Sequence, residues 1–346
     1  MPDDPDWNSL FLERILPAFA VKAGGQDQPR CVFVTGHQGS GKTTTLQRLL
    51  TELGPEQTQS IVPDALLGQL DVLHGPGPDA TQAFDAYRRI HCATHCERLA
   101  DHAVAKRAHI LWERAIPGNI ERIAIALRRL GYRVECLALA TPVPESWLAT
   151  LHRSLAASAS GNRAALHVSW PILVETALRW PVLLDRAESA LLFDRIAVLD
   201  HDGETAFDNH VIAAPDQRLW SDPAFAFESL LVERARARPE AALTALLADW
   251  DQLAPQIAAA EHPAWPPDDQ AAFDLHLRAL VADPGSRFDL DGPDPDPAAA
   301  QAWIGRLASD LAAVRASPEA RDQPTLASRS ERLLGLVRQV SGQPIR

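Results

Sequence analysis

Short apolar runs alternate with amphipathic stretches between residues 7 and 199. The runs predict buried strands, and the stretches, whose apolar residues stand three or four positions apart, predict helices. The expected strands lie at residues 31–35, 60–62, 108–112, 133–139 and 195–199, and the expected helices lie at 7–21, 43–53, 81–106 and 119–130 and begin again near 141 and 171. This alternation is typical of a three-layer α/β fold with a mainly parallel sheet.

The pattern changes after about residue 213, where the expected strands stop and 195–199 is the last of them. Amphipathic stretches rich in Ala, Leu and Arg follow near 223–238, 240–260, 267–282, 297–316 and 325–341, separated by Pro, Asp and Gly. We therefore expect two parts: an α/β domain over residues 1–212 and an α-helical C-terminal region over residues 213–346. No motif gives the second part a role.

The first expected strand runs directly into the pattern G-x-x-x-x-G-K-T, and a helix start follows it. The residues of this loop are Gly36, His37, Gln38, Gly39, Ser40, Gly41, Lys42, Thr43 and Thr44. Glycines let the backbone curl with its N–H groups inward, so that the loop and the positive end of the helix cradle a di- or triphosphate. Lys42 would reach the β- and γ-phosphates, and Thr43 would coordinate Mg²⁺. The motif predicts a P-loop NTPase-type fold that binds ATP and Mg²⁺.

Charged residues stand where they could reach this loop. Asp64 follows the second expected strand and Glu113 follows the third, and open parallel sheets bind ligands at the carboxyl ends of their strands. A carboxylate there could deprotonate an acceptor hydroxyl, and Arg153 and Arg163 could stabilise the charge of a transferred phosphoryl group. Other roles stay open: Asp64 could cap a helix or be an outer partner of Mg²⁺, and Arg153 could be a solvated helix residue.

Composition and charge narrow the class of protein. The chain has 346 residues and a formal net charge of −12, which argues against a nucleic-acid or membrane-surface partner because both need a basic face. The N-terminus is acidic, no apolar run reaches the length of a membrane span, and the four cysteines are too few for a disulfide framework. We therefore expect a soluble protein of the reducing cytoplasm.

One helical stretch has a spacing that could suit a metal. His91 and His95, and likewise Cys92 and Cys96, stand at i and i+4. A structural zinc site needs four ligands, and a second pair at suitable spacing is missing. We interpret Cys92 and Cys96 as small core residues.

The motifs together resemble those of the zeta-toxin family of bacterial toxin–antitoxin systems, over roughly residues 7 to 205. The shared features are the leading helix, the phosphate loop, an Asp after a short second strand, a strand ending in Glu, the segment Leu130–Val134, an arginine pair about ten residues apart, and Phe193–Ile196 before an Asp-x-Gly turn. The resemblance implies an ATP-dependent kinase that phosphorylates UDP-N-acetylglucosamine or a related UDP-sugar. It also implies a neutralising antitoxin that covers the ATP site.

The resemblance also implies roles for single residues. Lys42 and Thr43 match the family's ATP·Mg²⁺ loop, and Asp64 matches the aspartate that takes the proton from the substrate hydroxyl. Glu113 matches the acid that helps hold the substrate. Two more residues match the arginines of the lid that meet the ATP phosphates: Arg153 and Arg163.

The sequence departs from the family in the substrate half of the site. After Asp64 the family usually has a basic residue and His-Pro, but residues 65–67 here are Ala-Leu-Leu. After Glu113 it usually has Gly-Thr, whereas residues 114–117 here are Arg-Ala-Ile-Pro. The sequence therefore supports phosphoryl transfer more strongly than it supports a UDP-sugar as the substrate. The alternatives are a kinase for NAD or another nucleotide on the same fold, and a nucleotide-switched ATPase or binding protein.

Overall fold

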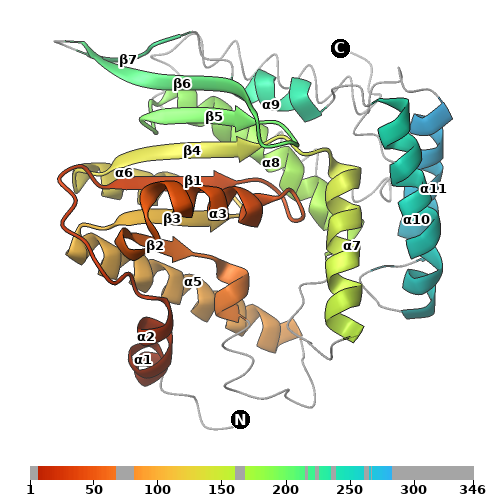
Figure 1. Cartoon of the computed structure of the whole chain (residues 1–346), viewed down its shortest axis with the longest axis horizontal. Coiled ribbons are helices and arrows are strands. Elements are labelled where there is room, and N and C mark those ends of the chain that lie inside the picture. Colours follow the sequence, from red (N-terminus) through yellow and green to blue (C-terminus); the bar gives the residue numbers. More distant parts are fainter. Residues whose placement is uncertain are drawn as a thin grey trace.

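Strands and helices alternate along the chain (Figure 1). The computed structural model describes residues 7–67, 82–159, 168–214, 217–222, 226–234, 239–260, 265 and 267–282. The strands are β1 (Arg30–Thr35), β2 (Thr58–Ile61), β3 (His109–Arg114), β4 (Arg133–Leu139), β5 (Arg195–Leu199), β6 (Thr205–Ala214) and β7 (Gln217–Trp220). The main helices are α3 (Lys42–Leu53), α5 (Gln82–Lys106), α6 (Ile120–Arg129), α7 (Val143–Ala159), α8 (Trp170–Ser189), α9 (Ala226–Arg234), α10 (Glu240–Ala260) and α11 (Pro267–Ala282).

Helical residues also lead the chain. They run as α1 (Trp7–Leu10), a π-helical turn η1 (Phe11–Ile15) and α2 (Leu16–Phe19), and a short 3₁₀ turn η2 (Pro55–Gln57) precedes β2. This leading segment and the helices α9, α10 and α11 confirm the corresponding sequence predictions. The predicted helices at 297–316 and 325–341 and the candidate Arg163 lie outside the described residues.

The seven strands form one sheet in the order β2-β3-β1-β4-β5-β6-β7. Strands β1 to β5 are parallel, and β6 and β7 are added antiparallel at one edge. Strand β1 lies between β3 and β4. The strands that follow it in the chain are therefore added first on one side of β1, as β2 and β3, and then on the other side, as β4 and β5. In such sheets the crevice for a ligand opens at the carboxyl end of the central strand. The mainly parallel three-layer fold is therefore confirmed.

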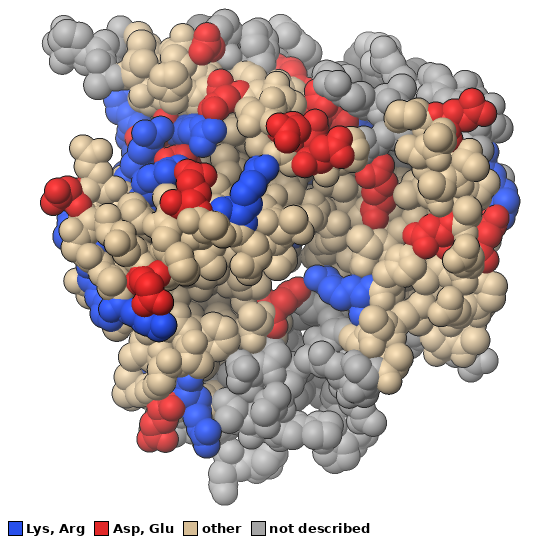
Figure 2. Space-filling view, viewed as in Figure 1, with Lys and Arg blue, Asp and Glu red and all other residues tan. Residues whose placement is uncertain are grey.

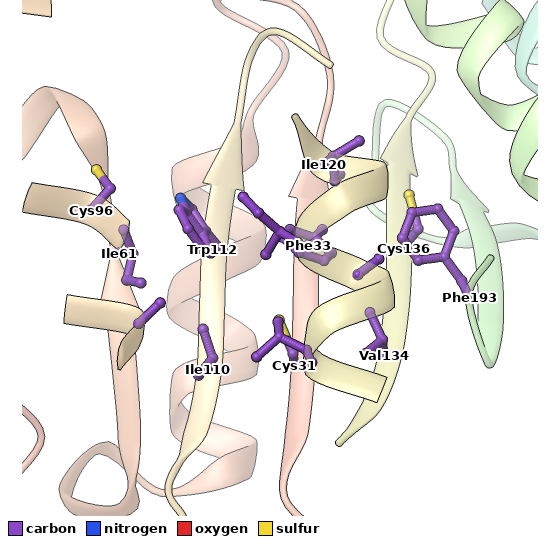
Figure 3. Packing of buried hydrophobic residues seen from close by; sticks show 14 of the residues in the cluster. Cys31, Phe33, Ile61, Cys96, Ile110, Trp112, Ile120, Val134, Cys136 and Phe193 are labelled. Atoms are coloured by element: carbon purple, nitrogen blue, oxygen red, sulfur yellow. The ribbon is translucent and has the colours of Figure 1, made fainter. Parts of the chain in front are cut away.

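Helices cover both faces of the sheet. On one face α3 packs Leu46 and Leu49 against the inner side chains of β1, β3, β4 and β5. On the other face α5, α6, α8 and α9 enclose a larger core in which Phe33 lies between Trp112 and Phe193, with ring centroids 6.0 and 6.2 Å apart (Figure 3). The cysteines at 31, 92, 96 and 136 are all buried, which confirms the interpretation of Cys92 and Cys96 as core residues.

Two expectations about strands are wrong. Residues 195–199 are not the last strand, because β6 and β7 follow as an antiparallel pair that extends to Trp220. Strand β6 lacks a continuous apolar run, because it carries polar residues such as Asp208, which binds Arg195 on β5 through two bonds of 2.7 Å. The second strand is Thr58–Ile61, not 60–62, so Asp64 lies within a helical segment at residues 63–67.

A third hydrophobic cluster joins the C-terminal helices to α7 and α8. Four aromatic rings lie at its centre: Trp147 of α7, Trp170 of α8, Trp250 of α10 and Phe273 of α11. In Figure 1, α7 stands between the sheet and the pair α10 and α11. The C-terminal helices thus support α7 from the side opposite to the sheet. Within the described residues, none of the helices combines the length and apolar character needed to cross a bilayer.

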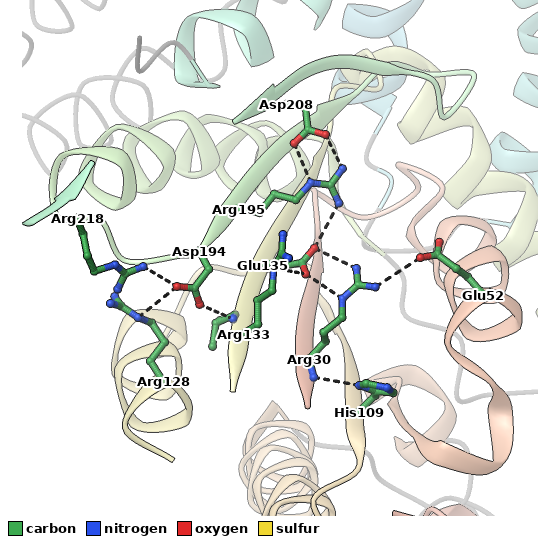
Figure 4. A network of polar contacts seen from close by, with 11 residues as sticks. Arg30, Glu52, His109, Arg128, Arg133, Glu135, Asp194, Arg195, Asp208 and Arg218 are labelled. Carbon is green, nitrogen blue, oxygen red and sulfur yellow. Dashed lines mark hydrogen bonds and ion pairs between the residues drawn. The ribbon is translucent and has the colours of Figure 1, made fainter. Parts of the chain in front are cut away.

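A polar network lies at the amino ends of the strands, away from the phosphate loop (Figure 4). The Glu135 carboxylate, with 1% of its side chain exposed, is bound by Arg30, Arg133 and Arg195 at 2.9, 3.1 and 3.3 Å. A buried carboxylate needs such partners because desolvation of a charge is costly. Figure 2 shows basic and acidic side chains mixed over the surface on this side of the sheet.

Candidate active site

The loop between β1 and α3 needs glycine at defined positions. Gly39 and Gly41 have φ of +76° and +87°, in the left-handed region that favours glycine. A Cβ on Gly39 would lie 2.0 Å from the Ser146 carbonyl oxygen, and a Cβ on Gly36 would lie 2.6 Å from the Ser40 Oγ. The tight curl therefore depends on the absence of side chains. It ends at Gly41, the residue before the first turn of the twelve-residue helix α3.

Lys42 is buried at the start of α3, with 5% of its side chain exposed. Its Nζ donates to the His37 carbonyl oxygen at 2.8 Å and lies 3.8 Å from Glu113 Oε1. Burial lowers the pKa of Lys42, and the charges of Glu113 and Asp64 oppose that shift. The ammonium thus lies folded back over the loop, within reach of an acidic group on the neighbouring strand.

Glu113 brings β3 into the site. It pairs in register with Val34 of β1, one strand away from the loop, and its Oε2 accepts a hydrogen bond from the Thr43 hydroxyl at 3.4 Å. Burial raises the pKa of Glu113, while the charge of Lys42 acts in the opposite direction. A hydroxyl and a carboxylate side by side are oxygen ligands of the kind that Mg²⁺ prefers.

Asp64 and Arg153 form the other side of the site. Arg153 Nη1 lies 3.3 Å from Asp64 Oδ2, and both side chains are about half exposed. Figure 2 shows the surface hollowed between the ends of the central strands and α7, with an acidic and a basic side chain facing each other there. The charges of Asp64 and Arg153 also act on the pKa of both Lys42 and Glu113. The structure therefore brings these four candidate residues into one electrostatic cluster.

The remaining loop residues have distinct surroundings. The His37 side chain is buried, its Nε2 is 2.8 Å from the Ser146 Oγ, and burial keeps the pKa of His37 well below 6.5. The Ser40 carbonyl accepts the Thr141 hydroxyl at 2.8 Å, whereas Thr44 is exposed. Within the described residues, Gln38 Oε1 is buried without a hydrogen-bond partner.

Sequence reasoning missed three residues that hold the loop in place: Thr141, Ser146 and Arg234. Thr141 and Ser146 lie just before and within the first turn of α7, and Arg234 ends α9. Only their position after predicted strands or in an amphipathic helix could be read from the sequence, and neither property indicates a contact with the loop. The loop therefore depends on elements that are distant in sequence.

The residues present fit ATP·Mg²⁺. Backbone N–H groups curled by glycine and the amino end of α3 suit phosphate oxygens. Lys42 would hold the terminal phosphates, and Thr43 would hold the metal. Bound Mg²⁺ would neutralise charge on the phosphates.

This fold and site define a kinase-like P-loop protein. A family model described as Zeta toxin matches residues 19–211, which is more than half of the chain, and the chain belongs to that family. No curated protein matches the chain.

Solved structures give fold-level likenesses. A structure of the PezAT chromosomal toxin–antitoxin system of Streptococcus pneumoniae is similar with a TM-score of 0.56 and 18% identity, covering 73% of this chain and 99% of that one. Two structures of an AvrRxo1-ORF1:AvrRxo1-ORF2 complex are similar at 13% identity. The native complex has a TM-score of 0.47 and covers 81% of this chain and 85% of that one, and the complex with ATP has a TM-score of 0.46 and covers 80% and 85%.

Proposed function

We propose that this chain is an ATP-dependent small-molecule kinase that transfers the γ-phosphate to a hydroxyl of a nucleotide-linked metabolite. The observation that carries the proposal is the cluster of Lys42, Glu113, Asp64 and Arg153 around one phosphate loop. Phosphoryl transfer needs cations and Mg²⁺ to absorb charge and a carboxylate to orient and deprotonate the acceptor. The cluster supplies two cations, Lys42 and Arg153, and two carboxylates, Glu113 and Asp64.

Each residue then has a role. Lys42 binds the β- and γ-phosphates, and Thr43 coordinates Mg²⁺. Asp64, the exposed carboxylate of the cluster, takes the proton of the acceptor hydroxyl, and Glu113, on the strand beside β1, helps to hold the substrate. Arg153 binds the transferring phosphoryl group, where its planar fork suits phosphate oxygens. Arg163 is proposed as a second arginine of the same kind.

The first candidate for the acceptor is UDP-N-acetylglucosamine, which follows from membership of the family. The second is NAD or another nucleotide, because the residues after Asp64 and Glu113 depart from the family pattern. The third hypothesis is that the protein is a nucleotide-switched ATPase and not a kinase. It is supported by the contact between the phosphate loop and α9, which would let nucleotide binding act on the C-terminal helices.

One assay separates the three readings. The purified chain is incubated with ATP labelled in the γ-phosphate, Mg²⁺ and a panel of UDP-sugars, NAD and nucleosides, and the products are resolved by chromatography. A labelled product identifies a kinase and its acceptor, and Asp64→Asn serves as the matched control that lacks the carboxylate. Release of ADP and phosphate with no labelled acceptor contradicts the kinase and supports the switch.

We also propose that the activity makes the protein a cytoplasmic toxin controlled by an antitoxin that covers the ATP site. Induced expression of the wild-type chain in a bacterium should slow growth, and Asp64→Asn, expressed to the same level, should not. Equal growth of both strains contradicts the toxin. Loss of toxicity on co-expression of a candidate antitoxin, with direct binding to the purified kinase, tests the partner.

A further inference from the structure

Arg234 is a buried cation beside the phosphate loop, and it comes from outside residues 19–211. It ends α9, has 7% of its surface exposed, and reaches His37, 197 positions earlier in the chain. Its Nη1 donates to the Ala177 carbonyl oxygen of α8, and its Nη2 lies 3.4 Å from His37 Nδ1. α9 therefore contacts the loop directly.

The contact fixes the protonation of His37. A guanidinium can only donate hydrogen bonds, so the Nδ1 that faces Arg234 must be the unprotonated nitrogen. Nε2 then carries the hydrogen and donates to the Ser146 Oγ at 2.8 Å. The burial of the ring and the charges of Arg234 and Lys42 all favour this neutral form, since each lowers the pKa of His37.

The charge of Arg234 is buried without a counter-ion among the described residues. Among the residues that the structure describes, no carboxylate pairs with it, and its Nε is buried without a hydrogen-bond partner. Burial lowers the pKa of Arg234 to about 9. An unpaired buried charge is costly unless an anion compensates it. The nearest feature built for anions is the phosphate loop itself, whose Lys42 binds the carbonyl of the same His37.

We propose that Arg234 is a positioning residue of the phosphate loop: it orients His37 toward Ser146 and supplies a second buried positive charge that a bound nucleotide polyphosphate compensates. The inference rests on the proposed function in that the loop must bind nucleotide phosphates. It adds a residue of the C-terminal part to the nucleotide site. His37 is then held at both ends, by Lys42 at its carbonyl and by Arg234 at its ring.

The test compares Arg234→Met, Arg234→Lys and the control Arg128→Met. Arg128 is a partly buried arginine that donates to the Leu191 and Leu192 carbonyl oxygens. Calorimetry measures the Kd of ATP·Mg²⁺, thermal unfolding measures the Tm of the ligand-free protein, and steady-state rates of ATP turnover give KM and kcat.

For Arg234→Met we expect the Kd and KM for ATP to rise about tenfold, the order of effect of one incompletely screened charge on an anion. The Tm of the ligand-free protein should change little, because the variant removes a buried charge with which no carboxylate in the described part of the chain pairs. Arg234→Lys should recover part of the affinity. Arg128→Met should instead lower the Tm and leave the Kd unchanged.

If Arg234 has only a structural role, Arg234→Met will lower the Tm and keep the Kd of the wild type. That result overturns this inference and leaves the proposed function intact. Failure of the wild type to bind ATP, or equal binding by wild type and Lys42→Ala, overturns the proposed function as well. If Arg234→Met does not fold, Ser146→Ala and Arg234→Lys decide the question. Both variants should raise the Kd for ATP severalfold. Wild-type affinity in both would contradict a role in ATP binding for the contacts that link Arg234, His37 and Ser146.

Discussion

The Arg153 guanidinium lies 3.3 Å from the Asp64 carboxylate, although the two residues stand 89 positions apart in the chain. The contact joins α7 to the helical segment at residues 63–67, across the end of the sheet that carries the phosphate loop. Both side chains are about half exposed, and such a pair typically contributes between 0 and about 1 kcal/mol. A phosphoryl group can therefore replace Asp64 as the partner of Arg153 at a small cost in free energy. The Asp64 carboxylate is then available to an acceptor hydroxyl.

Asp64→Asn should abolish phosphoryl transfer while leaving the affinity for ATP·Mg²⁺ nearly unchanged. The loop and Lys42 hold the nucleotide, whereas the carboxylate is needed only for the proton of the acceptor, an effect of about 10²–10⁴ in rate. Calorimetric titration of ATP and Mg²⁺ against the variant, with product formation followed in parallel, makes the measurement. A higher Mg²⁺ requirement with a joint loss of affinity and rate would instead identify Asp64 as an outer partner of the metal.

Lys42→Ala should remove ATP turnover and keep the fold, because the glycines shape the loop. Loss of an interaction aimed at the charge of the transition state typically costs 10² or more in rate, about 3 kcal/mol. Turnover with γ-labelled ATP makes the measurement, and the circular dichroism spectrum reports the fold. Turnover equal to that of the wild type would contradict the phosphate-loop assignment.

Residues that lie close together in the sequence were predictable from it, and residues joined by the fold were not. The strand, glycine turn and helix start at residues 31–44 carry their own signal, and the buried runs that became β1, β3, β4 and β5 are short and strongly apolar. The antiparallel β6 was missed because polar residues such as Asp208 interrupt its apolar pattern. Arg234 resembles any solvated arginine of an amphipathic helix, since its burial depends on how α9 packs against α8.

Gly39→Ala should prevent nucleotide binding, and Gly25→Ala provides a matched control. The two glycines have similar φ, +76° and +81°, so both variants carry a backbone strain of about 1 kcal/mol. Only at Gly39 does the new Cβ meet another atom, the Ser146 carbonyl oxygen at 2.0 Å, whereas nothing lies within 4 Å of it at Gly25. Binding of a fluorescent ATP analogue should be lost in the first variant and kept in the second. Equal affinities would show that the loop tolerates displacement of α7.

Phe273→Ala should destabilise the protein and raise its KM for ATP. Its ring is fully buried, with its centroid 4.6 Å from that of Trp147 on α7, and such truncations cost about 3–5 kcal/mol. A loosened α7 misplaces Arg153, so the KM for ATP should rise. Phe193→Ala, a similar truncation in the core below the sheet, is the control. Urea unfolding and ATP kinetics compare the two variants. Equal changes of the KM for ATP in both would mean that the aromatic cluster has no specific effect on the site.

Stability should fall with pH below neutrality, in part because of His95. Burial, with smaller effects from Arg98 and His91, lowers its pKa from 6.5 to about 4. Between these values the unfolded chain binds a proton that the folded protein does not. The contribution is therefore complete above pH 6.5 and is lost as the pH falls toward 4, at up to about 1.4 kcal/mol per pH unit.

The variant His95→Phe tests this. It removes the titrating group and keeps an aromatic ring stacked on Phe11, whose centroid lies 5.5 Å from that of His95. Urea unfolding at pH 7, 6 and 5 should give a shallower decline of the unfolding free energy for the variant than for the wild type. Parallel curves would mean that His95 takes up its proton in the folded state as readily as in the unfolded chain.

The contact between His37 and Arg234 also sets an order of events during protein synthesis. The ribosome completes the phosphate loop early, but 197 residues must still be added before its partner on α9 exists. At about 5–20 residues per second, those 197 residues take roughly 10–40 s. Throughout that interval the nascent chain carries a loop whose His37 ring lacks the guanidinium that orients it. The finished arrangement at the loop thus requires a chain that extends at least to Arg234 and cannot form on a shorter one.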